Sequence, residues 1–287
     1  AGCREMRESI DFRLFEGYAA KFLLPSVGKK LGAVTRQLVV PVGSDLYAKI
    51  GQADIEIRKK GKGGVFGGWS ISRNYTPKEL AAAELFQLRI TAFFEPEGTA
   101  CGTIYDESAV CPHCGAGRRL VGELVLDLGK VPKGKDFAQT IARDEWIVSK
   151  RLAQLFREHG MTGASFEPVK PCKKRREGSP VWFRLNITAP PVEAAAPTRF
   201  GVDPFDDDLA GRYRCPQGHV LGLNILSELS VGRGSWAGTD IAVTRQAVGH
   251  RQGVLVPSPL IVVSPRLRQL LIEHEVKGYK TEVAYLV

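Results

Sequence analysis

The sequence predicts an α+β protein whose C-terminal part is internally duplicated and whose residues 1–110 form a mixed α+β region. Three observations lead to this prediction. A 17-residue segment occurs twice, a cysteine motif occurs twice upstream of it, and short alternating strand patterns are interspersed with helix signals. We expect each copy to run in the order cysteine motif, connection, strand, helix and strand.

The repeated segment reads IVSKRLAQLFREHGMTG at residues 147–163 and VVSPRLRQLLIEHEVKG at residues 262–278. Nine of the seventeen positions are identical at an offset of 115. Ser149 and Ser264 stand where N-cap residues are expected, and Pro265 falls at the first helical position, where its missing N–H costs nothing. Both copies carry apolar residues at the i, i+3, i+4 spacing of a buried helix face: Leu152, Leu155 and Phe156 in the first, and Leu267, Leu270 and Leu271 in the second.

A short apolar strand is predicted before each helix and another after it, at residues 146–148 and 164–169 in the first copy and 260–263 and 279–287 in the second. The repeat also extends upstream, because the sequences DFAQT (Asp136–Thr140) and DIAVT (Asp240–Thr244) match at an offset of 104. The change of offset implies eleven additional residues in the second copy, most simply within 247–259.

These offsets set the predicted boundaries. The first repeat spans 111–169 and the second 215–287, and 170–214 is a linker with one strand at 181–188 and a Pro- and Ala-rich stretch at 189–197.

Residues 1–110 combine strand and helix signals. Alternating apolar residues predict strands at 36–42 and 53–58. Thr76, Pro77 and Glu79 form the pattern of a capping box, which predicts a helix through residue 86, followed by a strand at 88–94.

The cysteine motifs predict a zinc site. Cys111-Pro-His-Cys114-Gly115 has the form of a zinc knuckle, in which two thiolates wrap one ion and the following Gly eases the turn. Redox proteins share this spacing, but a redox pair does not explain the second motif, Cys215-Pro-Gln-Gly-His219. Cys111, Cys114, Cys215 and His219 together form a ligand set that tetrahedral zinc prefers. Four protein ligands leave no open position, so the expected site is structural.

Two alternatives stay open at this point. In one, Cys101 or His113 joins Cys111 and Cys114 in a local site, and in the other no metal binds. Cys3, Cys101 and Cys172 are interpreted as reduced thiols, and His159 and His274 as residues at helix C-termini, where the helix dipole favours positive charge.

Composition and motifs narrow the classes of function. No apolar run reaches the roughly 20 residues that span a membrane, residues 1–10 lack a secretory signal, and a cytoplasmic protein is expected. The phosphate loop, HExxH, the deaminase pattern, GxSxG and the EF-hand loop are all absent from the sequence. We therefore expect a non-catalytic protein, although an enzyme of an unfamiliar kind stays open.

The two knuckles and the closing segment from Leu260 to Leu267, with Gly278-Tyr279, resemble the double-CxxCG family of bacterial proteins associated with toxin immunity. The resemblance covers residues 111–287. It implies that Cys111, Cys114 and Cys215 bind metal and that the protein neutralises a toxin by binding it. The second knuckle departs from the family pattern, because it reads CxxGH.

Two functions are compared. The first is a protein-binding module of the immunity type, with a toxin as its partner. The second is a nucleic-acid-binding zinc protein, in keeping with the net charge of +9 and two basic clusters, of which the second precedes Trp182 and Phe183. The charged clusters are Arg58, Lys59, Lys60 and Lys62; Lys170, Lys173, Lys174, Arg175 and Arg176; and an acidic group of Asp203, Asp206, Asp207 and Asp208. No oligomeric state follows from the sequence.

Overall fold

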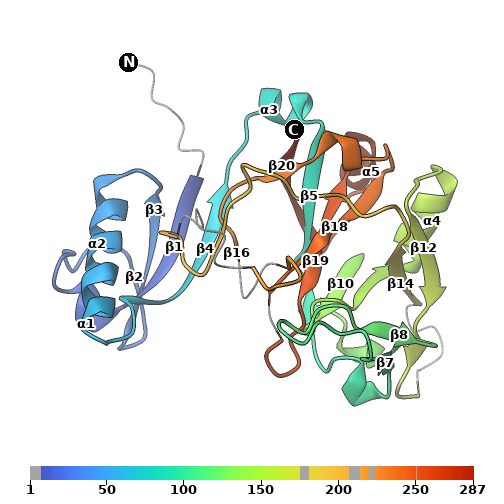
Figure 1. Ribbon diagram of the computed structural model, residues 1–287, viewed down its shortest axis with the longest axis horizontal. Coiled ribbons are helices and arrows are strands. Elements are labelled where there is room, and N and C mark those ends of the chain that lie inside the picture. Colours follow the sequence, from blue (N-terminus) through green and yellow to red (C-terminus); the bar gives the residue numbers. More distant parts are fainter. Residues whose placement is uncertain (1–7, 175–180, 207–213, 220–223, 250) are drawn as a thin grey trace. The chain divides into compact units, whose positions relative to one another are not determined.

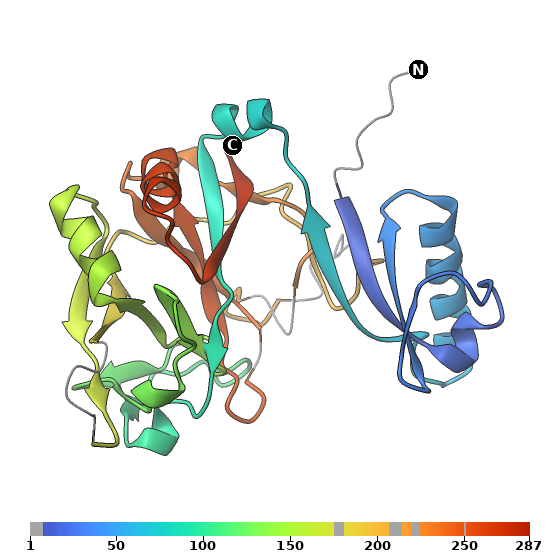
Figure 2. The same ribbon diagram turned by 180° about the vertical axis from the view of Figure 1, so that it is seen from behind.

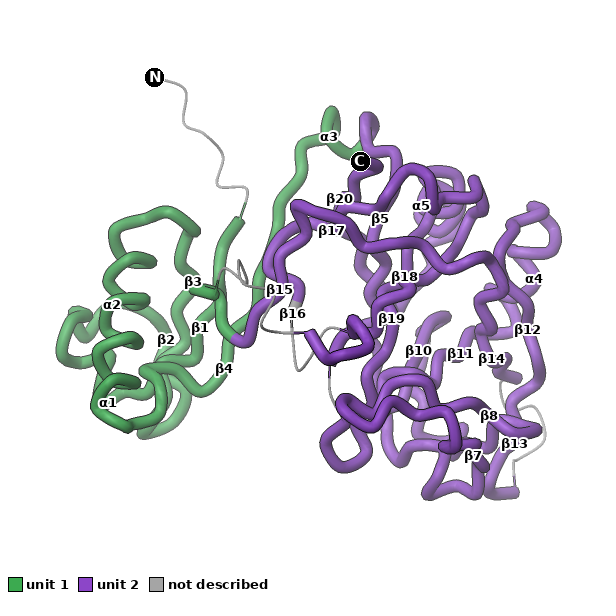
Figure 3. The backbone as a smooth tube through the Cα atoms, in the orientation of Figure 1, with its two compact units in different colours: residues 1–80, 203–206 green, residues 81–202, 207–287 purple. Residues whose placement is uncertain are grey.

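A computed structural model describes residues 8–174, 181–206, 214–219, 224–249 and 251–287 (Figure 1). The chain divides into two compact units, one of residues 1–80 with 203–206 and one of residues 81–202 with 207–287 (Figure 3). The predicted α+β class is confirmed. None of the described helices is long and apolar enough to cross a membrane.

Unit 1 contains a four-stranded antiparallel sheet in the order β2-β3-β1-β4. Its core forms between this sheet and the helix α2, with Phe12 and Leu38 buried opposite one another on neighbouring strands and Ile50 buried on the helix. The elements are β1 (Glu8–Phe15), α1 (Glu16–Ala19), β2 (Lys29–Leu31), β3 (Thr35–Pro41), α2 (Asp45–Lys59), β4 (Phe66–Arg73) and α3 (Pro77–Ala82).

The strand predicted at 53–58 is wrong, because these residues form the second half of α2. Residues 53–58 alternate between apolar and polar like a strand, but over the whole of residues 45–59 the apolar residues recur with the period of a helix. The side chains of Leu46, Tyr47, Ile50, Ala53 and Ile57 all pack into the core at helical spacing. Ser44, whose hydroxyl accepts from the Tyr47 N–H, caps this helix.

The capping box before α3 forms as predicted. The Glu79 N–H donates to the Thr76 hydroxyl, and the Glu79 carboxylate accepts from the Thr76 N–H in return. The helix ends at Ala82, earlier than expected, because Leu85 already begins the next strand.

Unit 2 is built on two five-stranded sheets, in the orders β12-β14-β11-β10-β6 and β17-β20-β5-β19-β18. The helices α4 and α5 bury their apolar faces on the first and second sheet, respectively (Figures 1 and 2). The first sheet is formed by β6 (Phe93–Phe94), β10 (Phe137–Thr140), β11 (Trp146–Ser149), β12 (Ala164–Pro168) and β14 (Trp182–Ile187), with α4 (Lys150–Glu158). The second is formed by β5 (Leu85–Ile90), β17 (Leu229–Val231), β18 (Ile241–Val248), β19 (Ser258–Val263) and β20 (Tyr279–Leu286), with α5 (Pro265–Glu273).

Short elements complete unit 2. They are η1 (Thr99–Cys101), β7 (Ile104–Asp106), β8 (Arg119–Val121), β9 (Val125–Leu126), η2 (Leu128–Lys130), β13 (Lys170–Pro171), β15 (Phe200–Gly201), β16 (Asn224–Ile225) and η3 (Arg233–Ser235). The strands and helices predicted in both repeats are present, and Ser149 and Ser264 cap α4 and α5 as expected.

The two sheets share one arrangement of strands. In the first, β14 lies between β11 and β12, and in the second β5 lies between β19 and β20. The registers match as well. Ala164 pairs with Ile187 on β14, and its counterpart Tyr279 pairs with Ile90 on β5.

The strands β5 and β14 are themselves similar in sequence. LFQLRITA at 85–92 and WFRLNITA at 182–189 share five of eight positions at an offset of 97. In the chain, β5 precedes the first knuckle but lies in the second sheet, and β14 precedes the second knuckle but lies in the first sheet. The predicted boundary at residue 110 differs from the division at residues 80 and 81, and the predicted linker contributes β14, an interior strand of the first sheet.

The buried carboxylate of Asp136 connects the start of α4 to the turn after α5. Asp136 accepts from the Ser149 hydroxyl at 2.8 Å and from Arg151 Nη2 at 2.6 Å. It also accepts from the Lys277 N–H at 3.0 Å, which belongs to the second segment. One side chain thereby joins the N-terminus of α4 to the turn that follows α5.

Asp240 makes the equivalent contacts at the start of α5, and it also binds the chain after α4. Asp240 accepts from the Ser264 hydroxyl at 2.9 Å, from Arg266 Nη1 at 2.9 Å and from the Thr162 N–H at 2.9 Å. Thr162 follows α4, so Asp240 contacts the chain after α4, just as Asp136 contacts the chain after α5.

The C-caps of the two helices meet. Arg151 Nη1 donates to the His274 carbonyl at 2.8 Å, and Arg266 donates to the His159 carbonyl. The imidazole rings lie edge to face with centroids 5.2 Å apart. Both histidines are C-cap residues, as the sequence predicted.

Leu155→Ala and Leu270→Ala each remove a buried core side chain, and we expect each to lower the free energy of unfolding by about 2–5 kcal/mol. Chemical denaturation measures this loss. Gln154→Ala, on the exposed face of α4, is the matched control and is expected to change stability by no more than about 0.5 kcal/mol. Near-neutral leucine variants would contradict the assignment of these helix faces to the core.

Asp136 gives a prediction about pH. Burial opposes its ionisation, but hydrogen bonds from Arg151, Ser149 and the Lys277 N–H prevail and hold the pKa of this carboxyl below its ordinary value. Its charged form therefore stabilises the fold above the unfolded pKa of about 3.9, and this stability is lost as pH falls through the lowered pKa.

We expect Asp136→Asn to lower the free energy of unfolding at pH 7 by about 1–3 kcal/mol, and this difference from the wild type to shrink below about pH 4. Urea denaturation across pH measures both. Glu123→Gln, which removes one charge of an exposed ion pair with Lys170, is the control and is expected to be nearly neutral. A difference independent of pH would contradict the role of the Asp136 charge.

Candidate metal centre

The first knuckle is the loop of the β7–β8 hairpin. The Cys111 N–H donates to the Ala116 carbonyl at 2.8 Å, and the Gly115 N–H donates to the Cys111 carbonyl at 2.8 Å. Gly115 has a φ of +79°, a conformation that favours glycine. These constraints close the turn and bring Cys111 and Cys114 to one side of it.

The second knuckle forms a tighter turn. The Gly218 N–H donates to the Cys215 carbonyl at 2.8 Å, and the Cys215 N–H donates to the His219 carbonyl at 2.9 Å. Gly218 has a φ of +81° and occupies the sequence position equivalent to Cys114. The turn therefore places its second ligand one residue later, at His219.

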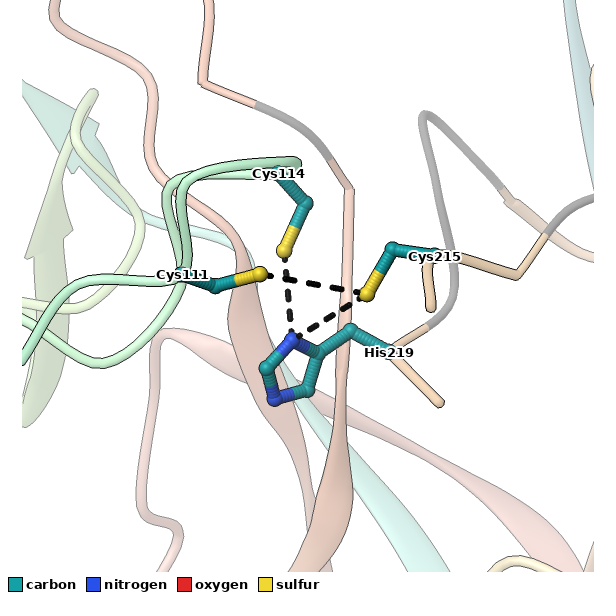
Figure 4. A group of neighbouring side chains, drawn as sticks. All are labelled: Cys111, Cys114, Cys215 and His219. Carbon is teal, nitrogen blue, oxygen red and sulfur yellow. Dashed lines mark hydrogen bonds between the residues drawn. The ribbon is translucent and has the colours of Figure 1, made fainter. Parts of the chain in front are cut away.

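The structure brings the four predicted residues together (Figure 4). Their ligand atoms all lie within 4.8 Å of one another. Cys111 Sγ and Cys215 Sγ are 3.9 Å apart, and His219 Nδ1 lies 3.3 Å from Cys114 Sγ and 3.6 Å from Cys215 Sγ.

Three of the six separations are close to those of a tetrahedral metal site. With zinc–sulfur bonds of about 2.3 Å and zinc–nitrogen bonds of about 2.0 Å, tetrahedral ligands lie about 3.8 Å apart for two sulfurs and about 3.5 Å for sulfur and nitrogen. The 3.9 Å sulfur pair is also far too long for a disulfide, whose bond length is about 2.05 Å. The buried cluster of three cysteines and one histidine could thus hold a metal ion such as zinc.

The surroundings of the sulfurs are apolar. Cys111, Cys114 and Cys215 are each at most 4% exposed and pack with Ala116 and Ala247. Burial raises the pKa of Cys114 to about 12, with the neighbouring sulfurs acting in the same direction. At Cys111 burial opposes the thiolate, but N–H groups of Cys114 and His113 and the His219 ring lower the pKa to about 6.

The loop between β18 and β19 braces the first knuckle. The Arg251 N–H donates to the Cys114 carbonyl at 2.8 Å, and its guanidinium pairs with both carboxylate oxygens of Glu107 at 2.7 and 2.8 Å. Gly115 is required beneath this loop, since a Cβ there would lie 2.6 Å from the Arg251 Cβ. Arg251 lies within 247–259, where the additional residues were inferred, and it supports the first knuckle, a role that sequence reasoning missed.

The local alternative is not formed in the described residues. His113 is exposed and contributes only its backbone N–H toward Cys111, while Cys101 lies beside Cys172 and Asp127. Cys3 falls outside the described residues.

A buried carboxylate that sequence reasoning missed holds the hairpin of the first knuckle. Glu145 accepts from the Tyr105 hydroxyl at 2.6 Å, the Thr140 hydroxyl at 2.5 Å and the Gly98 N–H at 2.9 Å, and Arg118 lies 3.3 Å away. Burial raises the pKa of Tyr105 far above its ordinary value. Since protein donors already surround the Glu145 carboxylate, the network positions β7 against β10 and offers no free acid or base.

No protein-family model matches this chain. A comparison with curated proteins gives no match either. The assignment of the site therefore depends on its geometry and on the chemistry of its four ligands.

Cys215→Ser removes one of three sulfur ligands, and we expect it to lower the metal content of the purified protein and destabilise the fold. Elemental analysis after dialysis measures the metal per chain, and denaturation measures stability. Cys172→Ser, at an exposed cysteine outside the cluster, is the control and should keep its full metal content. A fully loaded Cys215→Ser protein would exclude the four-ligand site.

Proposed function

We propose that Cys111, Cys114, Cys215 and His219 bind one structural zinc ion. The match of their separations to a tetrahedral shell supports this, as does the sulfur-rich ligand set. Four protein ligands leave no open position for a reacting water. The ion would link residues 104 positions apart, and closing so long a loop restricts the unfolded chain.

We also propose that unit 2 arose by internal duplication, with the first copy beginning at β5 and the second at β14. The equivalent strand registers support this, as do the reciprocal Asp136 and Asp240 contacts and the similarity of 85–92 to 182–189. Each copy contributes one knuckle, so the zinc ion would join the copies.

The function that the site supports best is that of a non-catalytic, zinc-stabilised module that binds a protein partner. We propose an immunity-type role in the cytoplasm, with a toxin as the partner. The observation that carries the proposal is the closed ligand set, because the one cluster of metal-binding residues found in the described part of the chain has no place for a substrate. The choice of a toxin as the partner rests on the similarity of the two knuckles to the double-CxxCG pattern.

Nucleic-acid binding is the competing proposal, and the net charge of +9 favours it. Other contacts weigh against it. Lys170 pairs with Glu123, and Lys173 pairs with Asp127 at 2.5 Å. Trp182 is buried in the core and is not free to stack on a base. Arg175 and Arg176 of the same cluster lie outside the described residues.

Two titrations of the zinc-loaded protein separate these proposals. We expect a reading frame next to this gene to encode a toxin that binds the protein saturably, measured by calorimetry. We expect no binding to generic DNA or RNA at low salt, measured by fluorescence anisotropy. Nucleic-acid affinity that falls steeply with salt would replace the protein-binding proposal with the competing one. Absence of binding to the neighbouring gene product would refute the toxin as the partner.

A further inference from the structure

One face of α2 in unit 1 is occupied by a short segment from far along the chain, residues 203–206. The face is formed by Tyr47, Gly51, Asp54 and Arg58, which follow one another at the spacing of a single helix face. The sequence places Asp203 and Asp206 in an acidic group and Arg58, near the end of α2, in a basic cluster. The structure joins the two.

The aromatic ring of Phe205 enters a space that Gly51 leaves open. A Cβ at Gly51 would lie 2.9 Å from the Phe205 ring, so any larger residue would collide with it. The ring centroid lies 4.8 Å from that of Tyr47, and the ring stacks on Phe12 at 5.8 Å with an angle of 11°. Phe205 thus has an aromatic pocket with a glycine at its base.

Polar contacts fix the ends of the segment. The Tyr47 hydroxyl donates to the Pro204 carbonyl at 2.8 Å, and Arg58 Nη2 lies 3.6 Å from Asp203 Oδ2. Asp54 orients Arg58 through a contact of 2.5 Å. The helix face thus contacts, in chain order, the Asp203 carboxylate, the Pro204 carbonyl and the Phe205 ring.

The segment holds its own shape. The Phe205 N–H donates to the Asp203 carboxylate at 2.9 Å, and the Asp203 N–H donates to the Asp206 carboxylate at 3.1 Å. Such a turn is already ordered when it docks, which lowers the entropy cost of binding.

The buried core cluster of unit 1 is built from one stretch of the chain. Its ten buried members all lie between Ile10 and Phe66, and Phe205 packs against them as a partly exposed addition, with its ring next to those of Phe12 and Phe66. These are the features of a docked peptide with one aromatic anchor rather than of a core element.

We propose that the α2 face is a peptide-binding site for an acidic–aromatic turn of the type Asp-Pro-Phe-Asp, that residues 203–206 are its intramolecular occupant, and that a protein partner carrying such a turn binds here by displacing them. Charge favours this occupant. Arg58 faces a ligand with an acidic residue at each end, and Asp203 and Asp206 both act on its charge. The inference rests on the proposed protein-binding function and names the chemistry of the partner.

The test uses the full-length, zinc-loaded protein and a fluorescent peptide of residues 199–208 (RFGVDPFDDD). Phe205→Ala vacates the pocket, whereas in the wild type the tethered segment competes with the peptide at a high effective concentration. We expect the variant to bind the peptide about tenfold more tightly than the wild type, or better, by fluorescence anisotropy. Asp203→Ala, which weakens only the charged contact, is expected to bind the peptide with intermediate affinity.

Two matched controls define the site. A peptide in which Phe205 is replaced by Ala should not bind, and Gly51→Leu added to Phe205→Ala should abolish binding because the new side chain fills the pocket. A folded Phe205→Ala protein with no affinity for the peptide would overturn the proposal. So would loss of hydrogen-exchange protection in α2 of that variant, because Phe205 would then be an obligatory part of the core.

Zinc content separates this inference from the proposed function. Phe205→Ala is expected to keep its full zinc content, so failed peptide binding in a zinc-loaded protein overturns the α2 site alone. Light scattering is expected to show a monomeric wild type. A dimer that dissociates in Phe205→Ala would assign the site to a second copy of the chain and overturn the proposed partner.

Discussion

Three sulfur atoms buried beside one another repel each other as thiolates, and burial in apolar surroundings makes each charge more costly. The pKa values of Cys111 and Cys114 shift in opposite directions. Backbone N–H groups and the His219 ring lower the pKa of Cys111, whereas burial and the neighbouring sulfurs raise the pKa of Cys114 despite a hydrogen bond from the Ala116 N–H. A divalent cation at the centre would remove this conflict. The chemistry of the cluster thus favours a metal site, and an ion there would join the two knuckles.

The paired sheets of unit 2 depend on a different constraint. The strands on either side of each helix do not pair with each other, because β14 lies between β11 and β12 and β5 lies between β19 and β20. The reciprocal contacts of Asp136 and Asp240 act in the same way, each joining one helix N-terminus to the turn after the other helix. Close backbone approach accompanies them, since a Cβ at Gly163 or Gly278 would lie 2.2 Å from the carbonyl of Ile241 or Phe137, respectively.

Unit 1 shows how charge clusters that look like solvated surface in the sequence can meet. Arg58 belongs to a basic run and Asp203 to an acidic one, yet they contact each other across more than half of the chain. Part of the net positive charge is thus used within the protein, as it is where Lys173 pairs with Asp127 and Arg251 with Glu107. The net charge therefore overstates the positive charge that is free to contact a partner.

The sequence by itself determined the local features of this protein. The N-caps at Ser149 and Ser264, the buried leucine faces of α4 and α5, the capping box at Thr76 and the identity of the four clustered residues follow from short-range spacing, which sequence displays directly. Only the tertiary structure decided which strand completes which sheet, that 53–58 is helical, that Arg251 braces the first knuckle and that Phe205 enters unit 1. Each of these depends on contacts between residues distant in the chain, or on burial that outweighs local alternation, and neither leaves a periodic pattern in the sequence.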